Sequence, residues 1–182
     1  MQPVPLIPDT APFSPEQRAW LNGLLAGVFS RTPISQPSTL NSQPAALQPL
    51  TILFGSQSGS AESLAKKAAK EAGKRGFAPM VLDMAQATPA SLASEKNLLI
   101  ITSTFGDGEP PDNAKALHAA LAAPDAPALA GLRYSVCAFG DTNYTHFCQA
   151  GKDFDHRLEK LGATRVHPRT DCDLDYEAPF QA

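Results

Sequence analysis

The sequence Ser56-Gln57-Ser58-Gly59-Ser60-Ala61-Glu62 lies between an apolar run at residues 50–54 and an amphipathic run at residues 61–75. The apolar run predicts a strand, and the apolar residues of the second run recur at helical spacing, which predicts a helix. The loop therefore directs its backbone N–H groups along a helix axis. A helix N-terminus carries unpaired N–H groups and about half a positive charge, so we expect the loop to bind a phosphate group without Lys or Arg.

The composition of this loop leaves two interpretations open. Its Ser and Gln side chains add hydrogen-bond donors, and Gly59 allows a close approach of the backbone. An ordinary strand-to-helix turn with Ser60 as N-cap has a similar composition. A Walker-type nucleotide site is disfavoured because the loop has no Gly-Lys-Ser/Thr ending, and the three spaced glycines of a dinucleotide fingerprint are also missing.

Length, charge and cysteine content restrict the class of protein. A chain of 182 residues suits one domain with some additional sequence. A net charge of -3 predicts no nucleic-acid or anionic-membrane partner. No apolar run approaches a membrane span of about 20 residues, and the N-terminus does not resemble a secretory signal, so we expect a cytoplasmic protein. Three cysteines without metal-site spacing favour reduced thiols and no metal site.

The chain divides into three parts. Residues 1–31 form a Pro-rich arm and a helix, whose start is predicted by Ser14 as N-cap, Pro15 at the first helical position and Gln17 in a capping box. That helix carries a large apolar stripe with Trp20. Residues 32–49, rich in Pro, Ser and Gln, predict a linker. Residues 50–182 are left for the main domain.

Strands alternate with helices in this main domain. Strands are predicted at residues 50–54, 78–83, 97–102, 133–139 and 165–168. Helices are predicted at residues 61–75, after Thr88-Pro89, at 112–122 and at 148–161, where Gly162 ends the last one. Alternation of this kind predicts an α/β fold with a doubly wound five-stranded parallel sheet, whose ligands bind beyond the carboxyl ends of the strands.

Two further loops leave those carboxyl ends. The second loop contains Ser103, Thr104, Phe105, Gly106, Asp107 and Gly108. The third loop contains Phe139, Gly140, Asp141, Thr142, Asn143, Tyr144, Phe147 and Cys148. An aromatic side chain from each loop could sandwich a flat ring, although Tyr144 and Phe147 could equally be anchors packed on the core.

Residues 50–173 resemble the FMN-binding, flavodoxin-like module of the diflavin reductases, and most closely that of the flavoprotein alpha subunits of NADPH-dependent sulfite reductases. The resemblance is most specific at residues 103–114, 140–144 and 147–155. The helix with Trp20 also looks like the leader of those subunits. The resemblance implies a flavodoxin-like sheet with an extra N-terminal helix, and FMN as the cofactor.

Positions in the three loops carry the implied FMN contacts. The resemblance implies that Ser56 to Ala61 hold the FMN phosphate, that Ser103 to Gly106 border the isoalloxazine, and that residues 139–148 close its other face. Tyr144 would stack on the ring, whereas Phe105 stands where many relatives have Tyr or Gln. Ser60 stands where Asn or Thr is usual.

The same resemblance implies the partners. FMN would receive electrons from an FAD/NADPH reductase domain and pass them singly to a sulfite reductase hemoprotein or another redox acceptor. Acidic residues would surround the flavin edge and steer a basic acceptor toward it. They are Asp107, Glu109, Asp112, Asp141, Asp171, Asp173 and Asp175.

The sequence ends at residues 177–182, where one more covering helix should begin, so we expect a fragment of a longer oxidoreductase. FAD and NADPH would then bind only to a missing downstream domain, and this chain would carry no catalytic residue of its own. Two alternatives stay open: a free-standing flavodoxin-like electron carrier, and a cofactor-free doubly wound interaction domain.

Overall fold

A computed structural model describes residues 6–8, 11–29, 47–176 and 180 of the chain. It contains two compact units, Met1–Gln43 and Pro44–Ala182. Most of the predicted linker at residues 32–49 lies outside the described residues. Within the described ranges, no helix is long and apolar enough to cross a bilayer.

The first unit contains helix α1 (Pro15–Phe29), which begins with the predicted capping box. The hydroxyl oxygen of Ser14 accepts from the backbone N–H of Gln17 at 3.2 Å, and the side-chain oxygen of Gln17 accepts from the N–H of Ser14 at 3.0 Å. The side chain of Trp20 is 67% exposed, and Leu24 is also exposed. The apolar stripe of α1 is therefore not covered by the described residues of its own unit.

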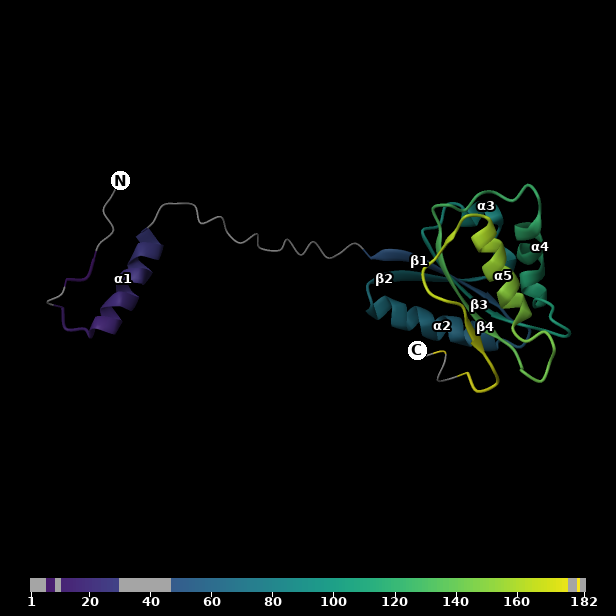
Figure 1. Cartoon of the computed structure of the whole chain (residues 1–182), viewed down its shortest axis with the longest axis horizontal. Coiled ribbons are helices and arrows are strands. Elements are labelled where there is room, and N and C mark those ends of the chain that lie inside the picture. Colours follow the sequence, from purple (N-terminus) through teal and green to yellow (C-terminus); the bar gives the residue numbers. More distant parts are fainter. Residues whose placement is uncertain (1–5, 9–10, 30–46, 177–179, 181–182) are drawn as a thin grey trace. The chain divides into compact units, whose positions relative to one another are not determined.

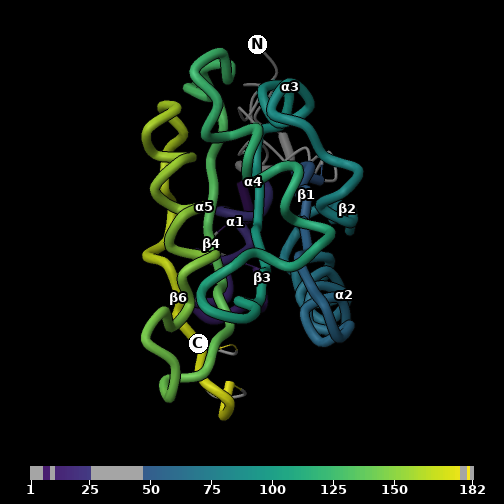
Figure 2. Tube along the Cα trace, turned by 90° about the vertical axis from the view of Figure 1, so that its right-hand side faces the viewer, coloured from purple at the N-terminus to yellow at the C-terminus, as the bar shows by residue number. Residues whose placement is uncertain are grey.

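The second unit is built on a parallel sheet with the strand order β2-β1-β3-β4-β5, and β6 also pairs with β4. The strands are β1 (Gln48–Gly55), β2 (Phe77–Asp83), β3 (Asn97–Ser103), β4 (Arg133–Phe139), β5 (Thr164–Arg165) and β6 (Thr170–Cys172). Figure 2 shows them side by side, from β2 at one edge to β6 at the other. The strand order reverses between β1 and β3, which is where a doubly wound sheet binds its ligand. The predicted doubly wound parallel fold is confirmed.

Helices connect the strands and cover both faces of the sheet. They are α2 (Ser60–Lys74), α3 (Pro89–Leu92), α4 (Lys115–Ala122) and α5 (Gln149–Lys160), with short 3₁₀ turns η1 (Met84–Gln86) and η2 (Asp112–Ala114). On one face, Leu53 and Ile100 pack in a buried cluster with residues of α4 and α5, which lie side by side (Figure 1). On the other face, Ile52 and Ile101 pack against α2. Neighbouring strand residues thus alternate between two buried faces.

The fifth strand position differs from the prediction at residues 165–168. It is occupied by two short strands, because β5 pairs with β4 at Arg133 and Tyr134 and β6 pairs with it from Cys137 onward. Arg165 and Thr170 are five positions apart, whereas their partners Tyr134 and Cys137 are three apart. Two extra residues are therefore looped out, in a segment where Pro168 has no N–H to donate.

The other element bounds agree with the predictions to within two residues. Helix α2 begins at Ser60 with Gly59 as its N-cap residue, so Ser60 is not the N-cap. The first turn of the predicted helix 112–122 is the 3₁₀ turn η2. Leu161 is the C-cap of α5, and Gly162 follows it with a φ of 90°. The expected start of a last helix lies outside the described residues, apart from Phe180, whose N–H donates to the carbonyl of Tyr176 at 2.9 Å.

Candidate functional site

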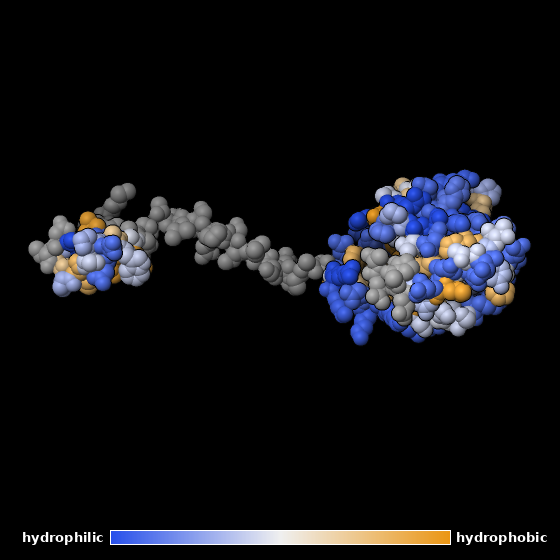
Figure 3. Space-filling model, turned by 60° about the horizontal axis from the view of Figure 1, so that its bottom comes forward, coloured by the Kyte–Doolittle hydropathy of each residue, from blue (hydrophilic) through white to orange (hydrophobic). Residues whose placement is uncertain are grey.

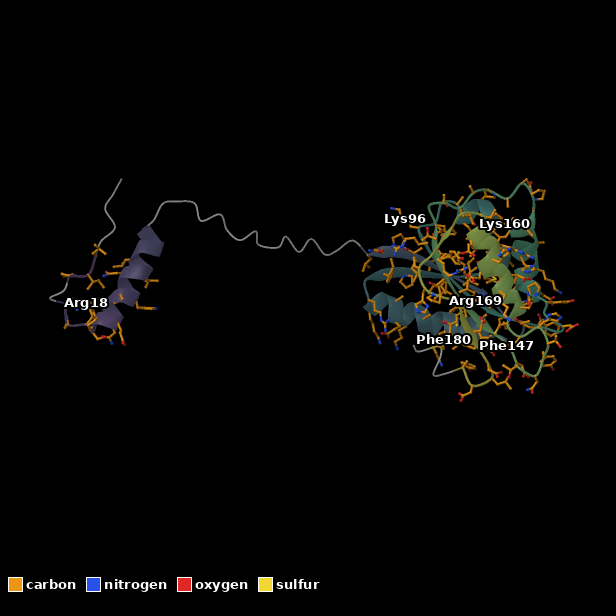
Figure 4. All side chains as sticks on the ribbon, viewed as in Figure 1. Arg18, Lys96, Phe147, Lys160, Arg169 and Phe180 are labelled. Carbon is orange, nitrogen blue, oxygen red and sulfur yellow. The ribbon has the colours of Figure 1, made fainter. Side chains whose placement is uncertain are left out.

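A cavity of about 500 Å³ lies where the loops leave the carboxyl ends of β1, β3, β4 and β6. In Figure 4, Phe147 and Phe180 lie at this end of the unit, and Lys96, which precedes β3, lies at the opposite end. The cavity is lined by Ser58, Ser60, Ala61, Leu64, Ser103, Thr104, Phe105, Gly106, Phe139, Gly140, Asp141, Tyr144, His146, Phe147, Cys148, Asp173, Leu174 and Tyr176. Residues of all three predicted loops therefore meet in one place.

The first loop wraps the N-terminus of α2. Gly59 has a φ of 85°, which turns the backbone so that successive N–H groups converge. The hydroxyl oxygen of Ser56 accepts from the N–H groups of Gly59 at 2.9 Å and of Ala61 at 3.3 Å. The hydroxyls of Ser58 and Ser60 are 3.1 Å apart. The loop thus gathers donors at one end of the cavity and contains no cationic side chain.

The second loop is a tight turn closed by two hydrogen bonds. The N–H groups of Phe105 and Glu109 each donate to the other's carbonyl at 2.8 Å. Gly108 has a φ of 103°, and a Cβ at its position would lie 2.8 Å from the Cβ of His146. This close approach packs the second loop against the third. Thr104 makes a further connection, because its N–H donates to the carbonyl of Phe139 at 2.8 Å.

The third loop is bonded to Asp173, the residue that directly follows β6. Asp173 accepts from the backbone N–H of Thr142 at 3.2 Å and from its hydroxyl at 2.5 Å. These hydrogen bonds lower the pKa of Asp173, and the bond from the Thr142 hydroxyl has the largest effect. The loop ends at Cys148, which has a φ of 55° and a fully buried thiol. Burial raises the pKa of Cys148 to about 12, so its thiol stays protonated.

Aromatic and apolar side chains form the open rim of the cavity. The side chain of Tyr144 is 61% exposed, and Phe105 and Leu174 are exposed beside the same cavity. Figure 3 shows several apolar patches among hydrophilic residues on one face of this unit. Phe139 is anchored instead, with its ring 5.4 Å from that of Tyr176 and 6.1 Å from that of Phe180. Within the described part of the chain, Phe105, Tyr144 and Leu174 are therefore exposed at this rim.

Some predicted site residues do not line the cavity. Ser56 and Gln57 bond to other loop residues, and Gly59 and Gly108 shape the backbone. Thr142 bonds to Asp173, and Asn143 donates to Asp141. Asp107 is exposed in the turn of the second loop. These residues shape the loops around the cavity.

Sequence reasoning missed four lining residues: Leu64, His146, Leu174 and Tyr176. Leu64 looked like an ordinary core position of α2, and His146 lay inside the third loop without an assigned role. Leu174 and Tyr176 follow β6 at the same edge of the sheet. A fourth loop at the carboxyl edge was the available signal for them.

The predicted acidic residues have different surroundings. Asp141 and Asp173 line the cavity. Asp112 is 2.7 Å from the Lys115 ammonium, and Asp171 is 2.7 Å from the Arg169 guanidinium. The Asp112 pKa is lowered, mainly by the hydrogen bond from Lys115. Two of the seven carboxylates are thus paired with basic side chains.

Comparison with known proteins places this chain in a family. Residues 52–181 match the flavodoxin family. The sulfite reductase (NADPH) flavoprotein alpha-component of Bacillus subtilis is 46% identical over 169 residues, which cover 90% of this chain and 28% of that protein. The corresponding protein of Vibrio vulnificus is 41% identical over 97% of this chain and 30% of its own length. The chain therefore spans less than a third of these relatives.

Solved structures show the same architecture. A flavodoxin from Streptococcus pneumoniae TIGR4 superposes with a TM-score of 0.65 at 29% identity, covering 73% of this chain and 90% of that one. A single-site mutant of a flavodoxin from Pseudomonas aeruginosa gives a TM-score of 0.63 at 30% identity, covering 74% of this chain and 90% of that one. The sequence match, the shared fold and the three loops at one sheet edge together show that this chain belongs to the flavodoxin family.

Proposed function

We propose that the cavity binds FMN and that the chain relays electrons within an NADPH-dependent sulfite reductase. The observation that carries this proposal is that one cavity is lined both by the N-terminus of α2, where a phosphate group could bind, and by aromatic side chains at its rim. Its volume of about 500 Å³ falls in the usual range for small-molecule sites. FMN, when bound, accepts and releases electrons one at a time.

The residues present fit this cofactor. Ser58, Ser60 and Ala61 would hold the phosphate, because they lie at the end of the cavity where N–H groups converge. Phe105 and Tyr144 stand at the rim, where the isoalloxazine would lie. Gly140 has no room for a side chain, since a Cβ there would lie 2.7 Å from the backbone nitrogen of Cys148. Gly140 therefore lets the two ends of the third loop pack closely together at the cavity.

The names of the relatives support a proposal for the partners. Proteins at 41–46% identity are named sulfite reductase (NADPH) flavoprotein alpha-components, and this chain covers 28–30% of their length. We propose that electrons come from an FAD/NADPH reductase domain and leave to a sulfite reductase hemoprotein. A cytoplasmic location suits this role and suits the three buried free thiols Cys137, Cys148 and Cys172.

Spectroscopy of the purified chain with added FMN tests the proposal. Oxidised flavin bands should remain with the chain after free FMN is removed by gel filtration, and FMN should bind more tightly than riboflavin, which lacks the phosphate. NADPH alone should leave the bands unchanged for many minutes, and adding a separate FAD-containing reductase domain should bleach them. Rapid bleaching by NADPH alone, or equal affinity for FMN and riboflavin, would contradict the proposal.

A free-standing electron carrier is the second candidate. It is favoured by the match to the two solved flavodoxins, because this chain covers 90% of the length of each. The two candidates differ in the acceptor. If the reduced chain passes electrons to a sulfite reductase hemoprotein and this transfer weakens at high salt, the first candidate is supported, because charged docking is screened by ions. If transfer to that hemoprotein does not occur and other acceptors are reduced, the free carrier is supported.

A further inference from the structure

Asn113, in the turn η2 that follows the second loop, joins the ends of two neighbouring strands. Its side-chain oxygen accepts from the backbone N–H of Ser56 at 3.0 Å. Its side-chain nitrogen donates to a carboxylate oxygen of Asp83 at 3.1 Å and to the carbonyl of Phe54 at 3.4 Å. Phe54 lies near the end of β1, and Asp83 is the last residue of β2. One amide group thus bonds to the two strand ends beside the first loop.

The neighbouring residue makes a second connection. The side-chain nitrogen of Gln57 donates to Asp112 at 3.0 Å, and the backbone N–H of Asp112 donates to the side-chain oxygen of Gln57 at 3.2 Å. Two consecutive residues of the first loop are therefore bonded to two consecutive residues of η2. The first and second loops are coupled at this point.

Gly55 allows η2 to lie this close to β1. A Cβ at Gly55 would lie 2.7 Å from the side-chain oxygen of Thr102 and 3.1 Å from the Cβ of Ala114. Ala114 is fully buried in the adjacent position. The absence of a side chain at Gly55 therefore brings Asn113 within hydrogen-bonding reach of Ser56.

The hydrogen bonds of Ser56 lead from Asn113 to the anion-binding end of the cavity. The side-chain oxygen of Asn113 accepts from the backbone N–H of Ser56. The hydroxyl oxygen of Ser56 in turn accepts from the N–H groups of Gly59 and Ala61. We propose that Asn113 is a positioning residue for the FMN phosphate, acting through Ser56 without touching the cofactor. This inference rests on the proposed FMN site.

The substitution Asn113→Asp tests the inference in the full 182-residue chain. It keeps the size and the acceptor oxygen but removes the donor, and it puts a second carboxylate beside Asp83. Asn97→Asp is the matched control, because Asn97 donates to the carbonyl of Pro49 at 2.9 Å and so pins the same strand at its other end. For each variant, titrations with FMN and with riboflavin give two dissociation constants.

In Asn113→Asp we expect the FMN dissociation constant to rise about tenfold or more and the riboflavin constant to rise less than about threefold. Asn97→Asp should leave their ratio unchanged. Asn113→Ala, which removes the amide without adding charge, should show the same difference between the two flavins, and it tests the inference alone if Asn113→Asp does not fold. A difference confined to Asn113→Asp would come from its added charge and would overturn the inference. Equal weakening of both ligands, or an unchanged FMN constant, would overturn the inference. Failure of the parent chain to bind either flavin would instead overturn the proposed function.

Discussion

Two glycines at opposite ends of α2 give a matched test of the proposal that the first loop binds phosphate. Gly59 precedes the helix with a φ of 85°, and Gly76 follows its C-cap residue with a φ of 88°. At both positions, nothing lies within 4 Å of the place where a Cβ would stand. The substitutions Gly59→Val and Gly76→Val therefore impose similar backbone strain without a clash in the protein.

Backbone strain and obstruction of the phosphate affect different quantities: strain lowers the free energy of unfolding, and obstruction raises the FMN dissociation constant. An L-residue in the left-handed region costs about 1–2 kcal/mol, so both variants should lose that much free energy of unfolding in urea titrations without FMN. Gly59→Val should also block the approach of the phosphate. Losing one hydrogen bond to a charged group, about 1.5–3 kcal/mol, corresponds to an FMN dissociation constant roughly ten to a hundred times higher.

The comparison between the two variants decides the matter. FMN titration, followed by the loss of flavin fluorescence, should show weaker binding for Gly59→Val and unchanged binding for Gly76→Val. Riboflavin should bind the two variants about equally, because it has no phosphate. The assignment of residues 56–61 to the phosphate would be refuted if Gly59→Val bound FMN as well as Gly76→Val does.

Three further predictions concern the rim, the core and the pH dependence. Tyr144→Ala should weaken FMN binding by about 1 kcal/mol and raise the fluorescence of the bound flavin; unchanged affinity and fluorescence would show that Tyr144 does not stack on the ring. Asp155→Ala should lower the free energy of unfolding by about 3–5 kcal/mol in urea titrations, because Asp155 is 5% exposed and lies 2.7 Å from Arg165 and 2.9 Å from Arg169; a loss below about 1 kcal/mol would contradict this account of the ion pairs. Burial raises the pKa values of Cys148 and Tyr134 to about 12, from 9.0 and 10.0, so both groups ionise first in the unfolded chain and the free energy of unfolding should fall as the pH rises from about 9 to about 12. Stability that stays constant over that range in urea titrations would contradict the burial of these groups.

The regular part of the fold was predictable because its signals are local. The strand at residues 133–139 has the predicted bounds, and α2 is displaced by one residue. Apolar periodicity and the helix start at Thr88-Pro89, which the structure also shows, are carried by residues close together in the sequence. The parallel order followed from the alternation of strands and helices.

The details of the site depend on contacts between distant segments, which periodicity does not report. Asn113 and Ser56 are 57 positions apart, and Thr142 and Asp173 are 31 apart. The interruption of the fifth strand position also has a tertiary setting, since Arg169 in the looped-out segment bonds to Asp155 of α5. Figure 4 shows Arg169 in the middle of this unit, between Lys160 at one end and Phe180 at the other. A sequence alone identifies such residues as polar loop positions but does not pair them.

The exposed side chain of Trp20 determines what intrinsic fluorescence can report. It is the only tryptophan of the chain, and it belongs to α1 in the Met1–Gln43 unit. Emission excited selectively from tryptophan therefore reports the surroundings of α1, and the strands of the sheet contain no tryptophan. A surface that covers α1 should shift this emission to shorter wavelength, whereas the tyrosines of the second unit and the flavin report directly on the sheet.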